Sequence, residues 1–451
     1  MSSSPSGPAA PWMQRLAGIE PRERKAVALA FGCYFVLFTS YYILRPVRDT
    51  VATVFGFEHL QWLFTATFVG TLLASPLFGA LASRLQLRRL LPGVFWFWLI
   101  NVLLFAMWFG HDANGREVAA VYYVWFSVSN LFMISVFWSL MVDLFASAQA
   151  VRLFAPIAAG GSLGAICGSA VTRLAVGSVG LRGLLLIAAA GFGAIIVLVH
   201  LLMREKDVLR AHSGEAQRST LDHGLGGNAF DGFAKLFRSA YAFNQTAFMV
   251  LMTYVNTVAY FFQTEVIEKS IKAITGRAVV IADMDLAVNL LSAAILIFGL
   301  TRIVQRFGVS AGLILNPLLM IVAFAALALS PTLLMIEVVQ VVRRIAQYAI
   351  ARPSREMCFT VVEQRDRYRT KNVIDTVGYR FGDLSAAWGE DGLRVLGLGI
   401  AGCSLVGCGV SMLWGTVAFA LGHRYEHLRR VQAGAAPPAV GAAGPVRPSA
   451  L

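Results

Sequence analysis

The 451-residue sequence is poor in charge, and above all in acidic residues. Only 14% of its residues are charged, with 25 Asp and Glu against 38 Lys and Arg. A soluble domain usually has about a quarter of its residues charged. Hydrophobic residues instead make up 57% of this chain. The composition excludes an ordinary soluble domain and predicts a polytopic membrane protein.

Motifs that carry chemistry are also missing. The sequence has no Gly-x-x-x-x-Gly-Lys, no His-Glu-x-x-His and no Gly-x-Ser-x-Gly, which mark nucleotide hydrolases, zinc proteases and serine hydrolases. It has no Cys-x-x-Cys either, and no His–Cys spacing that suits a metal. We therefore predict no enzyme, no cofactor and no metal site, and interpret all five cysteines as small packing residues: Cys33, Cys167, Cys358, Cys403 and Cys408.

Long apolar runs are what the sequence does contain. A run of about twenty residues spans a bilayer as a helix, because lipid leaves every backbone polar group to be satisfied internally. The fold class predicted is an all-α membrane protein with twelve transmembrane helices. The expected spans lie near residues 26–57, 59–82, 90–110, 118–145, 152–176, 181–203, 242–270, 281–303, 311–330, 332–357, 371–390 and 393–421.

The spans form two sets of six, separated by a polar stretch. This organisation is typical of a major-facilitator-type transporter, whose halves are parallel repeats. When the first half is aligned on the second with a shift of 220 residues, Arg45 matches Glu265 and Asp49 matches Lys269. This recurrence of embedded charges is weak evidence for such a repeat. The predicted parts are an N-terminal segment (1–25), a first half (26–203), a linker (204–241), a second half (242–422) and a disordered tail (423–451).

The net charge of +13 indicates how the chain is oriented in the membrane, and it does not indicate a nucleic-acid partner. Lys and Arg fall mostly in short loops, such as Arg22 to Lys25 before the first span and Arg204 to Arg210 after the sixth. Such loops stay on the cytoplasmic side of a membrane. We predict an inner-membrane protein, monomeric, with both termini and the linker in the cytoplasm.

Two arginines are embedded in the first span. Arg45 and Arg48 have apolar helix on both sides and share one face, with Asp49 four residues after Arg45. A charge at the bilayer centre is costly, so such residues face a water-filled cavity or a partner. The alternative is that both side chains reach the headgroups from near a helix end.

A polar stripe follows the tenth span through Glu337, Gln340, Arg344, Gln347 and Tyr348. Such a stripe either lines a cavity or forms a buried ion pair in which Glu337 neutralises an arginine, and the sequence does not decide between them. Arg343 lies off the stripe, and we interpret it as a structural residue.

Two further features have a structural explanation as well. Glu265 with Lys269, and Lys371 with Asp375, have the four-residue spacing of intrahelical ion pairs. Small residues at this spacing let two helices approach closely, and the sequence repeats them in the fifth and eleventh spans: Gly160, Gly164, Gly168, Gly378 and Gly382.

Several motifs together resemble the ATP/ADP translocase family, the nucleotide transporters of plastids and intracellular bacteria. Residues 44–49 (LRPVRD) are similar to its Leu-Arg-Asp-x-Lys-Asp, and 265–269 (EVIEK) to its Glu-Val-x-x-Lys. Phe137-Trp138 followed by 152–156 (RLFAP) is similar to a further family segment. The most specific matches are Arg355-Glu356-Met357 and residues 371–382, KNVIDTVGYRFG.

The resemblance implies a secondary transporter in which Arg48, Glu265 and Lys371 are needed for nucleotide transport. Departures are Pro46 for Asp, Arg48 for Lys, and no carboxylate between Glu117 and Asp143, where the family has a Glu. The expected solute is therefore a nucleotide or another phosphorylated or anionic compound, moved by exchange or by ion-coupled uptake. The rival interpretation is a membrane sensor or scaffold that has kept the fold. The candidate substrate-binding residues are Arg45, Arg48, Asp49, Arg152, Glu265, Lys269, Arg344, Lys371 and Asp375.

Overall fold

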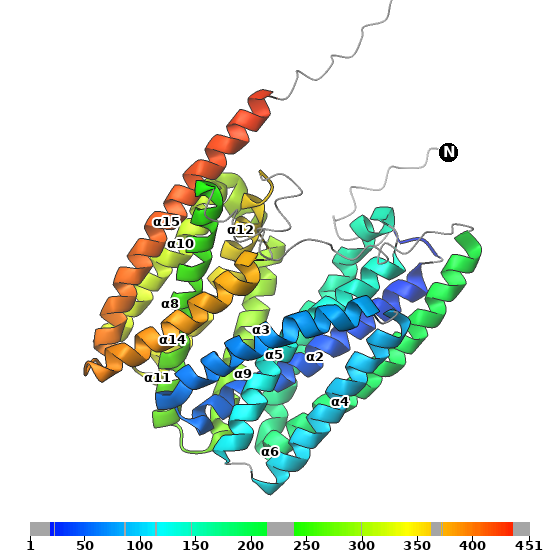
Figure 1. The fold of residues 1–451 in the computed structure, drawn as a ribbon, viewed down its shortest axis with the longest axis horizontal. Coiled ribbons are helices and arrows are strands. Elements are labelled where there is room, and N and C mark those ends of the chain that lie inside the picture. The colour runs from blue at the N-terminus through cyan, green and yellow to red at the C-terminus, as the bar shows by residue number, and fades with distance from the viewer. Residues whose placement is uncertain are drawn as a thin grey trace, which may run out of the picture.

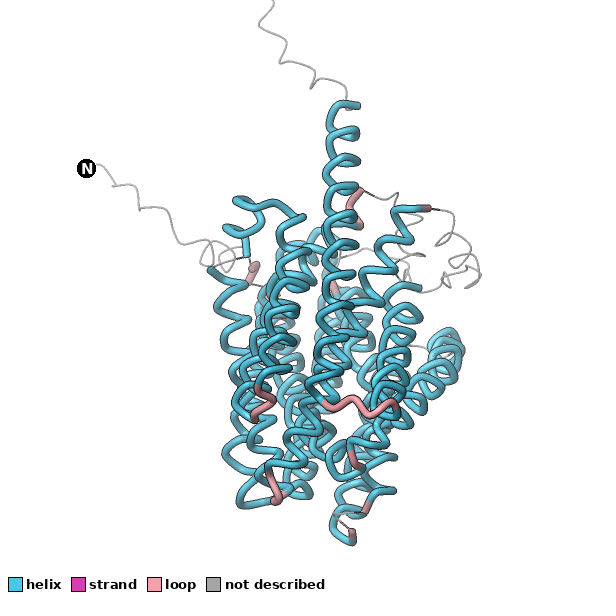
Figure 2. The backbone as a smooth tube through the Cα atoms, turned by 90° about the vertical axis from the view of Figure 1, so that its left-hand side faces the viewer, coloured by secondary structure: helices cyan, strands magenta, loops and turns pink. Residues whose placement is uncertain are grey.

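The computed structural model describes residues 19–21, 23–84, 87–112, 115–145, 147–213, 239–298, 300–361, 371 and 373–435. Helices joined by short connections make up nearly all of this part of the chain (Figure 2). The predicted all-α fold class is confirmed. The central part of the predicted linker and most of the predicted disordered tail lie outside the described residues.

The first half of the chain folds into long helices. A non-helical Gly180 (φ 65°) divides α6, so that this element carries both the fifth and the sixth predicted span. The elements are α2 (Arg24–Phe55), η1 (Phe57–His59), α3 (Leu60–Arg84), α4 (Leu87–His111), α5 (Arg116–Leu144) and α6 (Ser147–Ser213).

The second half contains the remaining elements, and each predicted span overlaps a helix. Eight helices of the described residues are long and apolar enough to cross a membrane. This number is compatible with twelve spans, because α6 holds two, the helix of the seventh predicted span (242–270) is not among the eight, and the tenth and eleventh spans are interrupted. The elements are α8 (Ala240–Ser270), α9 (Ile274–Phe298), α10 (Leu300–Leu329), α11 (Leu333–Ile345), η3 (Ala346–Ala351), α12 (Arg352–Cys358), η4 (Ile374–Gly378), α14 (Tyr379–Val395) and α15 (Ile400–Ala435).

Glycines allow α6 to pack directly on α2. A Cβ atom built on Gly160 would lie 2.6 Å from the backbone oxygen of Phe31, and Gly164 and Gly168 face the next turns of α2 in the same way. Gly382 of α14 likewise meets the backbone oxygen of Val250, on α8. The prediction that these glycines serve close helix packing is confirmed for Gly160, Gly164, Gly168 and Gly382. It is wrong for Gly378, where an added Cβ would meet only side-chain atoms at 3.8 Å or more.

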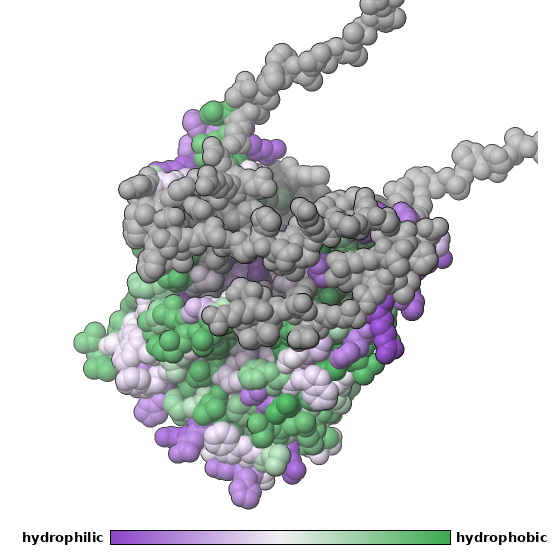
Figure 3. Space-filling view, turned by 45° about the vertical axis from the view of Figure 1, so that its right-hand side comes forward, coloured by the Kyte–Doolittle hydropathy of each residue, from purple (hydrophilic) through white to green (hydrophobic). Residues whose placement is uncertain are grey.

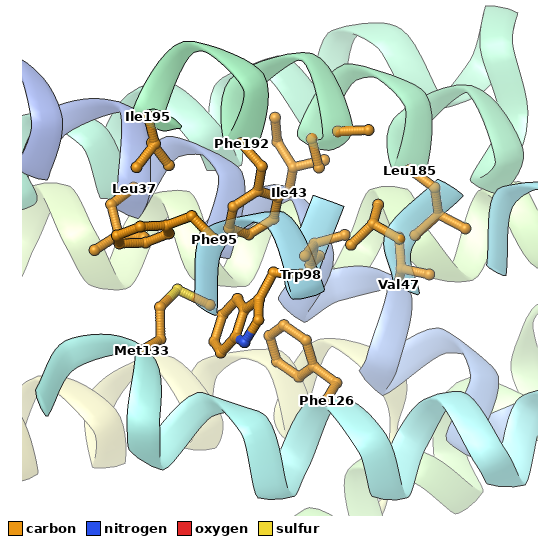
Figure 4. Packing of buried hydrophobic residues seen from close by; sticks show 14 of the residues in the cluster. Leu37, Ile43, Val47, Phe95, Trp98, Phe126, Met133, Leu185, Phe192 and Ile195 are labelled. Atoms are coloured by element: carbon orange, nitrogen blue, oxygen red, sulfur yellow. The ribbon is translucent and has the colours of Figure 1, made fainter. Parts of the chain in front are cut away.

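Buried hydrophobic residues form two large clusters. The first is built mainly from α2 to α6, where Phe95 and Trp98 of α4 lie beside Phe126 and Met133 of α5 and Phe192 of α6 (Figure 4). The second is built from α8 to α15 around Phe248, Phe324 and Trp414. On the face shown in Figure 3, hydrophobic residues cover much of the lower half, and hydrophilic residues gather at the lower end and the right-hand edge.

The first residues of α2 and the last residues of α6 and α15 lie at one end of the molecule, the upper end of Figure 1, which we call the terminal end. At the opposite, far end, residues 56–61 contact α8 and α14. The Phe57 N–H donates to Glu268 (2.9 Å), and the Gln61 amide donates to Asp391 (3.1 Å). The Trp388 indole N–H donates to Thr65 (3.1 Å). The two halves are therefore joined at the far end.

Ion pairs at the terminal end, by contrast, join residues of the same half. Arg152 binds Glu23 (2.7 Å) and Lys25 binds Glu205 (2.6 Å) within the first half. Within the second half Lys371 pairs with Glu356. In the part of the chain that the structure describes, the polar contacts between the halves are therefore concentrated at the far end and in the middle of the molecule.

Candidate functional site

Midway along the helices, two arginines from opposite halves converge on one carboxylate. Arg344 of α11 lies 2.6 Å from Oδ1 of Asp285, and Arg45 of α2 lies 3.7 Å from the same atom. Arg45, Arg344 and Asp285 are only 8%, 3% and 1% exposed. Arg344 also donates to Gln263 of α8 (3.3 Å). The sequence argument that the embedded arginines face a partner, and not the headgroups, agrees with this arrangement.

A second buried carboxylate, Asp49, lies one turn along α2. It accepts from Nε of the adjacent Arg48 (2.9 Å) and from the hydroxyl of Tyr260 on α8 (3.2 Å). Although Asp49 lies four residues after Arg45 on the same helix, its ion-pair partner is the adjacent Arg48. Asp285 takes Arg45 instead, because a buried guanidinium is stabilised by the carboxylate that its side chain can reach, whichever helix supplies it.

Arg343 is buried but has no carboxylate partner among the described residues. Its guanidinium donates to the side-chain oxygens of Asn256 (2.7 Å), Gln340 (2.6 Å) and Gln347 (3.3 Å). Amide oxygens satisfy the donors of an arginine without neutralising its charge. The side-chain partners of Arg343 therefore leave its charge without a counter-ion in the interior of the second half.

Arg380 and the buried Asp383 of α14 form a further pair, 3.4 Å apart. Asp383 also accepts from the Thr257 hydroxyl (2.7 Å). Arg380 donates across to the first half, to the backbone oxygen of Ser127 on α5 (3.3 Å). This pair therefore connects α14, α8 and α5.

Tyrosines connect these charged groups. Tyr348 lies within electrostatic range of Arg45, Arg343 and Arg344, and Tyr379 within range of Arg48, Arg380 and Tyr348. We call the charged residues the central cluster: Arg45, Arg48, Asp49, Asp285, Arg343, Arg344, Arg380 and Asp383. Because five arginines face three carboxylates, the cluster carries an excess of two positive charges.

Aromatic rings cover several of the arginines. The guanidinium of Arg45 lies 5.5 Å from the ring centre of Tyr42, and that of Arg48 lies 5.5 Å from Tyr123. Arg380 lies 5.8 Å from the ring of Tyr379. A ring face stabilises a cation without supplying an opposite charge, so these contacts preserve the cationic character of the cluster.

The sequence analysis missed Asp285, although the rule that identified Arg45 applies to it equally. Asp285 follows Ile281-Ala282-Asp283-Met284 at the start of an apolar run. It is Asp285, and not Glu337, that neutralises Arg344, so the alternative in which Glu337 pairs with an arginine is wrong for Arg344. Asp383 and Tyr260 were also missed, since only their contacts with α8 and α2 distinguish them from other polar residues.

Two of the predicted site residues lie at the far end. Glu265 accepts from Lys269 (2.6 Å), as its spacing predicts, and also from Arg394 of α14 (2.5 Å). Lys269 and Arg394 both lie against the ring of Phe57, at 4.8 and 5.2 Å from its centre. Glu265 and Lys269 therefore belong to the contacts that join the halves there.

Three more predicted residues lie toward the terminal end. Arg152 binds Glu23, which precedes Arg45 by 22 residues, or roughly 33 Å along a helix. Asp375 pairs with Arg355 (2.8 Å), while Lys371 pairs with Glu356. The expected intrahelical pair of Lys371 and Asp375 is therefore wrong, because residues of α12 reach both side chains first.

In the part of the chain that the structure describes, no group of His, Cys, Asp and Glu side chains could hold a metal ion. Beside its three carboxylates, the central cluster offers guanidinium groups, hydroxyls and aromatic rings. Such groups suit an oxyanion, since guanidinium binds carboxylate and phosphate through paired hydrogen bonds.

Comparisons with known proteins agree on the fold. The structure of the nucleoside transporter NupG aligns with a TM-score of 0.58 at 15% identity, covering 91% of this chain and 100% of that one. A bacterial homologue of the iron transporter ferroportin, in an inward-facing state, aligns with a TM-score of 0.61 at 12% identity, covering 88% and 99%. A bacterial homologue of the lysosomal transporter Spinster, inward-facing and unoccupied, aligns with a TM-score of 0.54 at 14% identity, covering 92% and 98%.

Identities this low establish the fold alone. No curated protein matches the sequence. The model of the Major Facilitator Superfamily matches residues 30–350, well over half of the chain. The chain therefore belongs to the Major Facilitator Superfamily.

Proposed function

We propose that this chain, a secondary transporter of the major-facilitator type, moves an anionic solute, and specifically a nucleotide or another phosphorylated compound. The central cluster is its binding site. Solute binding drives alternating access by drawing the two halves together around the anion.

The observation that carries this proposal is the buried excess of arginine, supplied by both halves. Arg45 and Arg48 come from α2, whereas Arg343, Arg344 and Arg380 come from the second half. Burying uncompensated charge is costly, so such residues in a membrane protein mark a solute pathway by default. A solute with two or more negative charges offsets that cost by neutralising the cluster.

The distribution of contacts between the halves supports alternating access. The halves are joined at the far end, where Glu268 holds the Phe57 N–H, while the ion pairs at the terminal end remain within each half. With the termini on the cytoplasmic side, as the loop charges predict, the end at which the halves are joined is the one away from the cytoplasm. Transport then requires the contacts at the far end to break and equivalent ones to form at the terminal end.

The aromatic surroundings of the arginines favour a solute that is both charged and planar. Tyr41 stacks on Phe126 (5.4 Å between ring centres), close to Arg48, which lies 5.9 Å from the same phenylalanine. A nucleobase stacks on such rings while its phosphates bind guanidinium groups. NupG, one of the structural neighbours, is a nucleoside transporter, and the arginines would adapt a similar fold to a phosphorylated solute.

The test is solute flux through purified protein in liposomes. Labelled ATP, ADP, inorganic phosphate, sugar phosphates and dicarboxylates are supplied outside, with and without the same solute inside. We expect uptake of at least one phosphorylated solute, faster with internal solute if the carrier is an exchanger. Arg343→Gln should abolish most uptake, whereas Arg352→Gln, an exposed arginine on the neighbouring α12, should not.

Binding without flux for every solute would instead favour the sensor or scaffold interpretation. Binding is measured by thermal unfolding, because a ligand that binds only the native state raises its apparent stability. A protein that neither binds nor transports any of these anions would contradict the proposal.

A further inference from the structure

Asp285 has an unusual set of contacts for a buried carboxylate. Its Oδ1 atom accepts from Arg344 and lies within 3.7 Å of Arg45, whereas its Oδ2 atom is buried and has no hydrogen-bond partner in the described part of the chain. A buried carboxylate normally uses both oxygens, because each unsatisfied one costs free energy. Asp285 is therefore held by charge more than by a complete set of hydrogen bonds.

We propose that Asp285 is an internal competitor of the solute. Its carboxylate binds the two arginines that the solute's oxyanion, a phosphate or a carboxylate, must also bind. The proposal rests on the proposed function, since it concerns the same central cluster, and it names the residue that sets the cluster's affinity for oxyanions.

The positions of the two arginines support competition. Arg45 belongs to the first half and Arg344 to the second, so an anion between them bridges the halves. The contact with Arg344 is tight, at 2.6 Å, while that with Arg45 is loose, at 3.7 Å. Asp285, which is anchored on α9, thus pairs closely with the arginine of the second half and only loosely with that of the first half. A free oxyanion is not anchored, and it can approach both arginines closely.

The remaining neighbours of Asp285 do not replace the solute. Tyr41 and Tyr42 of α2 and Tyr348 of η3 lie within its electrostatic range. Gln263 of α8 reaches it only through Arg344. Asp49 acts on the same two arginines. A solute oxyanion therefore enters a region that already contains two carboxylates. Its affinity depends on how completely the ion pairs of Asp285 with Arg45 and Arg344 are broken when it binds.

The experiment compares two neutralising variants on the same helix. Asp285→Asn removes the competing charge with little change of shape. Asp283→Asn, two residues earlier, is the control, because Asp283 is half exposed and pairs with Arg173 (2.5 Å) outside the cluster. Binding of ATP, inorganic phosphate and sulfate to the purified full-length protein is measured by calorimetry and thermal unfolding, with ionic strength held constant by potassium chloride.

We expect Asp285→Asn to bind these oxyanions about tenfold more tightly than the unaltered protein, the change that one charge-assisted contact typically produces. Asp283→Asn should bind them as the unaltered protein does. Sulfate should also raise the unfolding temperature of Asp285→Asn by more than that of the other two proteins, because it restores the missing negative charge between Arg45 and Arg344.

Equal or weaker oxyanion binding by a folded Asp285→Asn would overturn the proposal and leave Asp285 as a purely structural residue. If the variant is unstable, the same sulfate and ATP titrations decide, since a loss of stability that neither anion restores also contradicts it. Failure of the proposed function looks different: the unaltered protein would transport no anion, whatever the binding by Asp285→Asn.

Discussion

Arg277 donates from Nη1 to both the backbone carbonyl oxygen and the hydroxyl of Thr53, each at 3.0 Å. Its remaining nitrogens donate to the backbone oxygens of Ile271 (2.7 Å) and Glu268 (3.1 Å). One side chain of α9 thus satisfies carbonyl groups at the ends of α2 and α8, which belong to opposite halves. The far end is therefore closed by a contact that must break for the carrier to open there.

Removal of that contact should favour opening of the far end. Each hydrogen bond of a charged donor contributes about 1.5–3 kcal/mol, so Arg277→Gln should shift the equilibrium between open and closed far ends by tenfold or more. The measurement is labelling of a cysteine at Phe64, in a protein without other cysteines, by a membrane-impermeant thiol reagent. Lys272→Gln, an exposed lysine in the loop before α9, is the control, and unchanged labelling in Arg277→Gln would rule out this role.

Separate roles in stability and transport are expected for Arg48 and Asp49. Arg48→Ala leaves a buried carboxylate without its cation and should destabilise the protein by about 3–5 kcal/mol. Arg48→Ala/Asp49→Ala should recover much of that stability but no transport, because the solute still lacks Arg48. Thermal unfolding and solute uptake are measured on both variants. Full uptake by the double variant would show that Arg48 does no more than neutralise Asp49.

Close packing of α6 on α2 makes Gly160 sensitive to one added methyl group. The Cβ atom of Gly160→Ala would lie 2.6 Å from the backbone oxygen of Phe31, so one helix must shift, at a cost of about 1–3 kcal/mol. Gly177→Ala, on the same helix, meets no atom within 4 Å and should be neutral or stabilising. Thermal unfolding in detergent measures both. Equal unfolding temperatures would contradict the packing argument.

The orientation of the chain has a direct test. The end of α6 at Ser213 and the end of α15 lie with the start of α2 at the terminal end (Figure 1). Reporter fusions after Ser213 and at the C-terminus should therefore give the same signal, and the basic short loops predict that this signal is cytoplasmic. A periplasmic signal from either fusion would refute the predicted orientation.

The sequence alone was sufficient for those properties that depend on local composition. Apolar runs of about twenty residues identify membrane helices, because the bilayer sets their length. Gly160, Gly164 and Gly168 indicate a packing face, because helical periodicity places them on one side. Arg45 and Arg48 are recognisable as functional candidates from the sequence, because a charge inside a membrane helix is costly whichever residue neutralises it.

Only the tertiary structure decided which charges meet. Asp285 lies 240 positions after Arg45 in the chain, and Arg394 lies 129 positions after Glu265, so no helical spacing connects either pair. The local pairing expected for Lys371 and Asp375 failed for the same reason, whereas Asp49 does pair with its neighbour Arg48. Coulomb attraction depends on distance and burial and not on sequence separation, so a buried charge pairs with whichever opposite charge the packed helices bring near it.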